Sequence, residues 1–333
     1  MDWEKAGRVL KAHKFEPPLG RRLSRSVFKD AVEAYADVDF LPAEIQRDLE
    51  REAPLLCVSP VKTSRSRDGT VKALLDLADG KQVESVLMRP SPRRWTACVS
   101  TQTGCPIGCP FCATGASGPG RGLSPEEMAD QVLFWRRALR RQAPAELLSN
   151  VVFMGMGEPF LNYENLAQSL RMLLDQRLFG LGARHITVST AGLAPRMERF
   201  ASEFPQVNLA LSLHAANDQL RDRLVPINRT YPLSLLARTL KSAYADSGRK
   251  VFIEYVVMKG VNDSERDASD LAGFVQAIDP KLLQVNLLRC NPAGAEADAR
   301  RFQKLLKEAG LICTVRESLG LDIEAACGQL AAG

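Results

Sequence analysis

Apolar and polar positions from residue 95 to residue 288 follow one repeated pattern: a short apolar run, a loop, and then a stretch with helical spacing. The six strand-like runs are WTACVST (95–101), NVVFMGM (150–156), RHITVST (184–190), VNLALSLH (207–214), KVFIEYVVM (250–258) and LLQVNLL (282–288). Strands that are apolar on both faces are typical of parallel sheets covered by helices. The pattern therefore predicts an α/β fold of six β-α units, with the sheet either open or curved into a partial barrel.

Helical stretches separate most of these runs, and the one over residues 124–141 carries its own start signals. Ser124 is suited to cap the first turn, Pro125 fits the first helical position, and Glu127 completes a capping box. We therefore expect a helix to begin at this point.

The first 94 residues have a different rhythm. Residues 25–38 and 42–53 have helix-like apolar spacing, whereas residues 70–88 contain two strand-like runs divided by Asp79-Gly80, a typical hairpin turn. We expect a small accessory domain of helices and a β-hairpin over residues 1–94, and a main domain over residues 95–333.

The composition places the chain among ordinary globular proteins, with 45% apolar and 25% charged residues. It contains no apolar run of about 18 residues, which a membrane-spanning helix would need, and its start lacks the hydrophobic stretch of a signal peptide. We therefore expect a cytoplasmic protein with no membrane partner. In that compartment, eight cysteines favour metal binding or catalysis over a disulfide framework.

The net charge of +5 does not by itself identify a nucleic-acid partner, but the basic residues are clustered. The clusters in the first 141 residues are Arg21, Arg22, Arg25 and Lys29; Lys62, Arg65 and Arg67; Arg89, Arg93 and Arg94; and Arg136, Arg137, Arg140 and Arg141. Such clusters can neutralise phosphates, although solvated faces have the same composition. Their concentration favours a side of the molecule that faces RNA or DNA.

Polar residues interrupt the apolar pattern where the predicted strands end. Three cysteines follow the first strand, and the other strand ends carry Gly157 and Glu158, Ser189, His214 and Asn291. Because the carboxyl ends of parallel strands meet at one edge of the sheet, chemistry gathers there in such folds. The arrangement predicts an active-site mouth.

Cys105, Cys109 and Cys112 form a C-x3-C-x2-C motif with Phe111 before the last cysteine. Structural zinc sites and ferredoxin clusters use four protein ligands, and no fourth ligand is nearby. Three thiolates on a four-iron cluster would leave one iron open. The spacing resembles that of the radical S-adenosylmethionine enzymes, in which this cofactor binds the open iron and is cleaved to a 5′-deoxyadenosyl radical. The protein then supplies ligation, orientation and exclusion of water.

Six further stretches indicate which family of these enzymes the chain resembles. They are, in chain order, CVSTQTGC, VVFMGMGEPFLN, RHITVSTAG, LALSLHAANDQLRDRLVPIN, IEYVVMKGVND and DIEAACGQL, and the resemblance as a whole runs from about Asp68 to the C-terminus. Together they resemble the RlmN/Cfr family of radical S-adenosylmethionine enzymes, which methylate adenosine in RNA. The resemblance implies a partial (βα)6 barrel, a [4Fe-4S] cluster on Cys105, Cys109 and Cys112, and S-adenosylmethionine as cofactor. It also implies 23S rRNA and/or tRNA as substrate and an electron donor such as flavodoxin or ferredoxin. No sequence feature predicts an interface between copies, so we expect a monomer.

The resemblance also implies catalytic roles. Cys327 would accept a methyl group from one S-adenosylmethionine, and the radical made from a second would abstract hydrogen from that methyl group. The resulting carbon radical would add to adenine. Cys98 would then attack the sulfur of Cys327, release methylated RNA and leave a Cys98–Cys327 disulfide that is reduced at each turnover. Glu84 corresponds to the proton acceptor of the family.

Residues at the predicted strand ends match the S-adenosylmethionine contacts of the family. They are Gly157, Glu158, Ser189, Ser212, Leu213, His214 and Asn291. The remaining cysteines, Cys57, Cys290 and Cys313, match no family role, so we expect them to pack in the core, with Cys290 bordering the site.

The choice of ring carbon depends on few residues. Proline at position 159 is a point of resemblance to the family members that modify carbon 2 of adenine. We therefore favour carbon 2 over carbon 8, the atom that the enzymes of the Cfr type modify.

Residues 116–124 and the six residues after Cys327 depart from the family pattern, so a divergent enzyme with a different RNA substrate also fits the sequence. Two further functions stay open: a radical S-adenosylmethionine enzyme with a non-RNA substrate, and an RNA-binding or redox-sensing cluster protein without catalysis.

Overall fold

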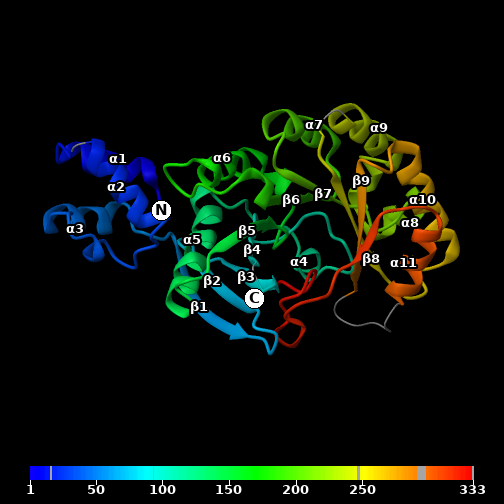
Figure 1. Cartoon of the computed structure of the whole chain (residues 1–333), viewed down its shortest axis with the longest axis horizontal. Helices are drawn as coiled ribbons and strands as arrows, with labels where there is room; N and C mark the ends of the chain where they lie inside the picture. The colour runs from blue at the N-terminus through cyan, green and yellow to red at the C-terminus, as the bar shows by residue number, and fades with distance from the viewer. Residues whose placement is uncertain (16, 93, 246–247, 291–297, 332–333) are drawn as a thin grey trace.

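Ten strands form a single sheet in which each strand lies beside its neighbours in the chain (Figure 1). The structure is a computed structural model that describes residues 1–15, 17–92, 94–245, 248–290 and 298–331. The first four strands are antiparallel; they are β1 (Val58–Arg65), β2 (Val71–Leu77), β3 (Gln82–Ser91) and β4 (Arg94–Cys98).

From β4 onward every strand is parallel to its neighbour. These strands are β5 (Leu148–Phe153), β6 (Ile186–Thr190), β7 (Asn208–Ser212), β8 (Val251–Val257), β9 (Leu283–Arg289) and β10 (Cys313–Val315). The six predicted strands are β4 to β9, which confirms the α/β class and the partial-barrel order. Strand β10 was not predicted, because three residues are too short to establish a pattern.

The described helices connect successive parallel strands or precede the sheet. They are α1 (Trp3–Ala12), α2 (Pro17–Phe28), α3 (Ala43–Glu52), α4 (Ala113–Ala116), α5 (Pro125–Gln142), α6 (Tyr163–Leu174), α7 (Ala194–Glu203), α8 (Asp218–Leu224), α9 (Leu233–Tyr244), α10 (Glu265–Ile278) and α11 (Ala299–Glu308). Figure 1 shows α7, α9, α10 and α11 along the outer side of the parallel strands. None of the helices in the described ranges has the length and apolar character needed to cross a membrane.

The predicted start of α5 is confirmed in atomic detail. The Glu127 amide donates to Ser124 Oγ at 3.1 Å, and the Ser124 amide donates to the Glu127 carboxylate at 2.8 Å. These reciprocal bonds satisfy two amides that the helix itself leaves without partners.

The predicted helix over residues 25–38 is wrong beyond Phe28. The amides of Lys29 and Asp30 both donate to the Arg25 carbonyl, which ends α2, and Ala31 follows in the left-handed region with φ 51°. The Asp37 carboxylate then accepts from the amides of Glu33 and Ala34. This local side-chain bonding offers the backbone an alternative to a continued helix, and only a short 3-10 turn forms over Tyr35–Asp37.

The hairpin of β2 and β3 is confirmed, with Asp79-Gly80 in its turn. Strand β1 was missed because most of its residues are polar and exposed, as suits a sheet edge. Strands β3 and β4 pair across residues 91–94, so the sheet continues through the expected domain boundary. The division into residues 1–94 and 95–333 stays a prediction.

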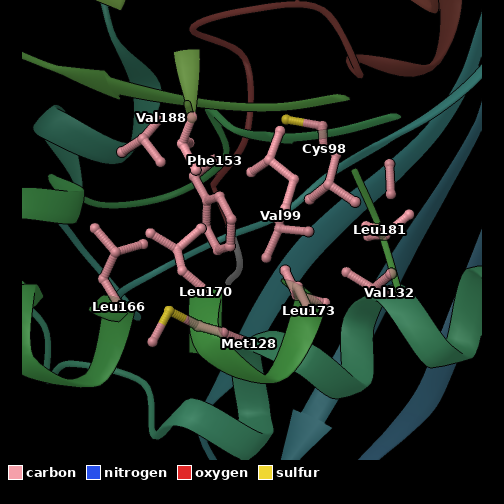
Figure 2. Close-up of a cluster of buried hydrophobic side chains, with 14 of the residues drawn as sticks. Cys98, Val99, Met128, Val132, Phe153, Leu166, Leu170, Leu173, Leu181 and Val188 are labelled. Carbon is pink, nitrogen blue, oxygen red and sulfur yellow. The ribbon is translucent and has the colours of Figure 1, made fainter. Parts of the chain in front are cut away.

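One large apolar core lies between the sheet and the helices α5 and α6. Figure 2 shows Leu166 and Leu170 of α6 beside Phe153 of β5, with Met128 of α5 below them. Burying side chains of this kind contributes about 1.5–3 kcal/mol each. In the same view the sulfur of Cys98 points away from these helices, so the end of β4 presents its thiol to the opposite side of the sheet.

The arginines of α5 do not form the phosphate-binding cluster that their spacing suggested. Arg136 donates to the carbonyls of Phe28 and Phe179 at 2.6 and 3.0 Å, and Arg137 is buried. Arg141 pairs with Glu33 at 2.7 Å. Arg136 and Arg141 thus attach the end of α2 and the residues after it to α5. The bonds of Arg136 and the burial of Arg137 take these two residues out of any RNA-facing surface.

Candidate active site

The three motif cysteines lie in the loop between β4 and α4, and all are free thiols. Burial raises the pKa of Cys105 to about 12 and also raises that of Cys109; nearby thiols of the motif and Glu158 add to both shifts. A side chain at Gly115 would place its Cβ 2.8 Å from the Cys109 carbonyl oxygen, so only glycine allows α4 to pack against the loop. The loop thus gathers three thiols.

The surroundings of these thiols fit an iron–sulfur cluster. Cys105, Cys109 and Phe111 pack on an apolar group formed by Ile107, Ala191, Ala215, Leu220, Leu224, Val225, Val256 and Met258. Within the described ranges, no three or more Cys, His, Asp or Glu side chains gather where they would hold a single metal ion. In a cluster each thiolate binds a different iron, so its ligands need not meet at one point. The donor set therefore suits a thiolate-bound cluster rather than a lone zinc ion.

Arg221 of α8 is completely buried beside this loop and was not predicted. Its guanidinium donates to the carbonyls of Leu213 at 3.0 Å, Ala191 at 2.7 Å and Ser212 at 3.2 Å. A fourth bond reaches Asn228 Oδ1 at 2.7 Å. The same positive charge acts on Cys109, where it counteracts the rise in pKa that burial causes. Arg221 thus fixes the segments after β6 and β7 and brings positive charge to the cysteine loop.

Gly157 and Glu158 follow β5, as predicted, and the structure gives a steric reason for the glycine. Gly157 has φ 98°, and a Cβ there would lie 2.6 Å from Gln102 Cβ. The Gln102 side chain in turn accepts from the Glu158 amide at 2.7 Å. The turn after β5 is therefore packed directly against the loop that leaves β4.

The Glu158 carboxylate is buried and holds the strand ends together. Its Oε1 accepts from the Phe160 amide at 3.0 Å and its Oε2 from the Ala191 amide at 2.7 Å. Burial raises the pKa of Glu158 to about 7, although these bonds act in the opposite direction. The Thr190 side chain also bonds to this carboxylate, which has about four lone-pair sites, so one site remains to accept from an ammonium group as well.

His214 lies two residues beyond β7 in the left-handed region, with φ 59°. Its Nδ1 accepts from the Val256 amide at 3.1 Å, which assigns the ring proton to Nε2. Burial, together with the charge of Arg221, lowers the pKa of His214 to about 3. The neutral ring meets Phe111 edge to face, with centroids 4.9 Å apart. His214 therefore joins the end of β7 to the cysteine loop.

The other predicted cofactor contacts lie around the same strand ends. Ser189 on β6 donates to the Phe153 carbonyl at 3.0 Å, and Ser212 and Leu213 present the carbonyls that Arg221 binds. Asn291 lies outside the described residues. The structure thus groups the described members of the predicted set near one mouth.

The C-terminal segment, residues 320–331, passes over this mouth and carries Cys327. The Ala113 amide donates to the Gly328 carbonyl at 2.8 Å, and Thr114 Oγ1 donates to the Leu330 carbonyl at 2.5 Å. Cys327 itself is exposed, yet enclosure of its sulfur by protein raises its pKa, as do Glu254 and Cys112 beside it. The predicted methyl carrier is therefore a neighbour of a predicted cluster ligand.

Cys98 ends β4 and is buried. Burial raises its pKa, and so does the neighbouring Cys327. Both thiols are free, so the disulfide expected between them is not formed in this structure. The fold nevertheless brings together two cysteines that lie at opposite ends of the main domain.

Glu84 on β3 could have been an exposed strand carboxylate, but it is only 6% exposed. Its Oε1 pairs with Lys72 Nζ at 2.8 Å, and its Oε2 accepts from the Ala331 amide at 2.9 Å. The predicted proton acceptor therefore contacts the same C-terminal segment that carries Cys327. Lys72 was not predicted.

A row of polar side chains crosses β7 to β10 beneath Cys327. Ser212, Glu254, Asn286 and Thr314 are register partners. The Asn286 amide donates to Glu254 Oε1 at 2.8 Å, and Thr314 donates to Asn286 Oδ1 at 2.8 Å. Glu254 was missed by the sequence reasoning, although a carboxylate inside an apolar strand is a detectable signal.

The remaining cysteines pack as expected. Cys313 is buried in the main core, and Cys57 is half-buried against it. Cys290 packs against the apolar group that also contains Cys105 and Cys109, so it borders the candidate site.

Comparisons with known proteins agree with this geometry. Residues 99–272 match the model of the radical SAM superfamily. The dual-specificity RNA methyltransferase RlmN of Magnetococcus marinus is 46% identical over 272 residues, which cover 80% of this chain and 74% of that protein. The chain belongs to the RlmN family. A probable RlmN of Syntrophomonas wolfei is 39% identical, and the match covers 93% of this chain and 90% of that protein.

A solved structure extends the agreement to the whole chain. The radical SAM methyltransferase from Sphaerobacter thermophilus superposes with a TM-score of 0.92 at 40% identity, covering 100% of this chain and 98% of the other. The likeness to this methyltransferase therefore includes the N-terminal region, whereas the sequence resemblance was apparent only from about Asp68 onward.

Proposed function

We propose that this RlmN-family enzyme methylates carbon 2 of an adenosine in RNA, either 23S rRNA, tRNA or both. The names of the similar RlmN proteins and Pro159 support this substrate and this carbon. The observation that carries the mechanism is that Cys327 is near enough to Cys98 to raise the pKa of its thiol and is itself influenced by Cys112 of the cysteine motif. A thiol pair in that place is what transfer through a methyl-carrying cysteine needs.

Cys105, Cys109 and Cys112 would hold a [4Fe-4S] cluster, and S-adenosylmethionine would bind next to it. The carboxylate of Glu158 would accept from the amino group of the cofactor, and the segment from Ser212 to His214 would line the same site. When bound, the cluster and S-adenosylmethionine would supply a radical that removes hydrogen from an unreactive methyl group. The apolar residues around the motif exclude water from that chemistry.

Cys327 would carry the methyl group because it lies near Cys112 of the cysteine motif and near Cys98. Cys98 would resolve the covalent RNA intermediate by attacking the Cys327 sulfur, which forms a disulfide and frees the product. Because only a thiolate is an effective nucleophile, the raised pKa of Cys98 keeps it unreactive until its proton is removed. Glu84 would accept the proton that leaves the adenine carbon.

The disulfide and the cluster both require electrons, so we propose a small electron-transfer protein such as flavodoxin or ferredoxin as a partner. We propose a monomer that acts in the cytoplasm, where its RNA substrates are used.

Anaerobic methylation of RNA tests this function. The enzyme, with its cluster reconstituted, is given methyl-labelled S-adenosylmethionine, a reductant and unmodified total RNA, and the digested nucleosides are identified by mass spectrometry. We expect label in 2-methyladenosine. Label in 8-methyladenosine would support the Cfr-type activity instead, whereas label only on Cys327 would indicate a different substrate.

A further inference from the structure

Lys72 and Glu84 form a largely buried ion pair beneath the C-terminal segment. Their charged atoms are 2.8 Å apart, and the side chains are 14% and 8% exposed. Buried charges are stabilised only when their remaining hydrogen-bonding groups also find partners. The partners in this case come from the segment that carries Cys327.

The ion pair contacts this segment on both sides of the cysteine. Lys72 Nζ donates to the Glu324 carbonyl at 3.1 Å, three residues before Cys327. Glu84 Oε2 accepts from the Ala331 amide at 2.9 Å, four residues after Cys327. A single ion pair therefore fixes both ends of the short stretch that holds the methyl-carrier thiol.

The same ion pair lies on the sheet face that presents Cys98. Lys72 pairs in register with Val86, and Val86 pairs with Cys98, so the three side chains point to one face. Ser85 points to the other face, where it accepts from the Trp135 indole at 2.9 Å. Neighbouring strands are about 4.8 Å apart, so Lys72 and Cys98 stand roughly 10 Å from each other.

The segment also makes contacts of a different character, one of which is the bond that the Arg67 amide donates to the Asp322 carboxylate at 3.1 Å. The Gly320 amide donates to the Asp68 carboxylate at 2.7 Å, and Gly328 and Leu330 accept from Ala113 and Thr114 of the cysteine-loop region. Each of these contacts holds one point of the segment. The Lys72–Glu84 pair, by contrast, links points on either side of Cys327 to β2 and β3, on the sheet face that presents Cys98.

We infer that Lys72 is a positioning residue of the reaction and that, with Glu84, it clamps the Cys327 stretch so that its thiol stands against Cys98. This inference rests on the proposed pairing of the two cysteines. Holding two reacting groups in place raises their effective concentration, and this advantage is lost when the holding contacts are removed.

Thiol–disulfide exchange measures that effective concentration directly. The full-length protein with its cluster in place is equilibrated anaerobically with mixtures of reduced and oxidised glutathione. In the reaction, two protein thiols are oxidised to one disulfide while one oxidised glutathione is reduced to two glutathione thiols. Alkylation followed by peptide mass spectrometry then gives the fraction of Cys98–Cys327 disulfide, a readout that does not depend on RNA methylation.

We expect Lys72→Met to lower the effective concentration of the pair at least about tenfold. Lys72→Arg, which keeps the charge, should restore most of the loss. The matched control is Lys81→Met, because Lys81 is exposed in the turn between β2 and β3 and should leave the value unchanged. If Lys72→Met does not fold, the double change Lys72→Met with Glu84→Met removes both charges together and should show the same loss.

Two results would overturn the inference in distinguishable ways. An unchanged effective concentration in a folded Lys72→Met or double variant, with the disulfide present in the unaltered protein, would refute the clamp alone. Failure of the unaltered protein to form a Cys98–Cys327 disulfide under any glutathione mixture would refute the proposed cysteine pair, and the clamp with it.

Discussion

The strand-end site and the C-terminal segment meet at the same mouth, but they are built in different ways. Around Glu158 and Arg221, buried charges are tied to backbone groups of the sheet and its loops. The C-terminal segment contains only a short 3-10 turn and is held by single contacts and by the Lys72–Glu84 pair. The difference suits their proposed roles, because a cofactor has to be held rigidly, whereas a carrier cysteine has to exchange partners during turnover.

The largest expected effect is the loss of RNA methylation, and the cluster content of two variants distinguishes the two regions. Cys112→Ala and Cys327→Ala should both abolish RNA methylation. Only Cys112→Ala should also lose the cluster, because Cys327 is not a ligand. Iron analysis and the visible absorbance of the reconstituted proteins measure this difference. Loss of the cluster in Cys327→Ala would contradict the separation of roles.

The second largest effect is expected for Arg221→Gln, which should destabilise the strand-end site. The change leaves buried carbonyls of Ala191, Ser212 and Leu213 without their donor, and each such loss costs about 1–3 kcal/mol. We expect the free energy of unfolding to fall by at least roughly 3 kcal/mol, measured by urea denaturation. Arg223→Gln on the same helix is the control, since this side chain is exposed. Equal stability of the two variants would show that Arg221 does not organise the strand ends.

Gly157→Ala tests the close packing in the same region. A Cβ at this position would strike Gln102 and would also face a backbone φ of 98°, a strain of about 1–3 kcal/mol before the clash is counted. Gly310→Ala is the matched control, because Gly310 has φ 79° but no atom within 4 Å of the added Cβ. We expect the melting temperature to fall further for Gly157→Ala, together with weaker S-adenosylmethionine binding. Equal effects would mean that strain alone, and not packing, requires the glycine.

The smallest expected effect is a pH dependence of cofactor binding. Burial raises the pKa of Glu158 to about 7, so the folded protein binds a proton there that the unfolded chain releases near its ordinary value of 4.5. The folded state is therefore favoured by this group at low pH, and the contribution is lost as pH rises from about 4.5 to about 7. The carboxylate that we propose to accept from the amino group of S-adenosylmethionine forms over the same interval.

Affinity for S-adenosylmethionine should accordingly rise as pH increases through about 7, as measured by equilibrium dialysis with the cluster in place. Glu158→Gln should bind more weakly and lose this dependence. His214 does not contribute to the change, because its pKa of about 3 keeps it neutral throughout the range. A dependence that survives in Glu158→Gln would assign the titration to another group.

Sequence reasoning predicted the regular parts of this molecule. Strands β4 to β9, the capping box of α5 and the hairpin turn depend on local patterns, and the structure has all of them. The cysteine motif and Glu158 were found because polar residues interrupt apolar strands at their ends. These signals are local in the chain and therefore visible without a fold.

The residues that sequence reasoning missed are buried charges with distant partners. Lys72 and Arg221 look like ordinary surface charges in the sequence, and only the fold brings them to Glu84 and to the strand-end carbonyls. The end of α2 was misplaced because the Asp37 carboxylate competes with the helix for backbone amides. Tertiary contacts decide the roles of Lys72 and Arg221, so no period or propensity in the sequence reveals them.

The central claim is that Cys98 resolves an RNA intermediate bound to Cys327. Its most direct test is to incubate Cys98→Ala anaerobically with S-adenosylmethionine, reductant and RNA, and to separate the products on a denaturing gel. The account predicts a stable covalent adduct between RNA and protein that maps to Cys327 and is absent when Cys327 is also changed to alanine. Release of methylated RNA by Cys98→Ala at the rate of the unaltered enzyme, without any adduct, would contradict it.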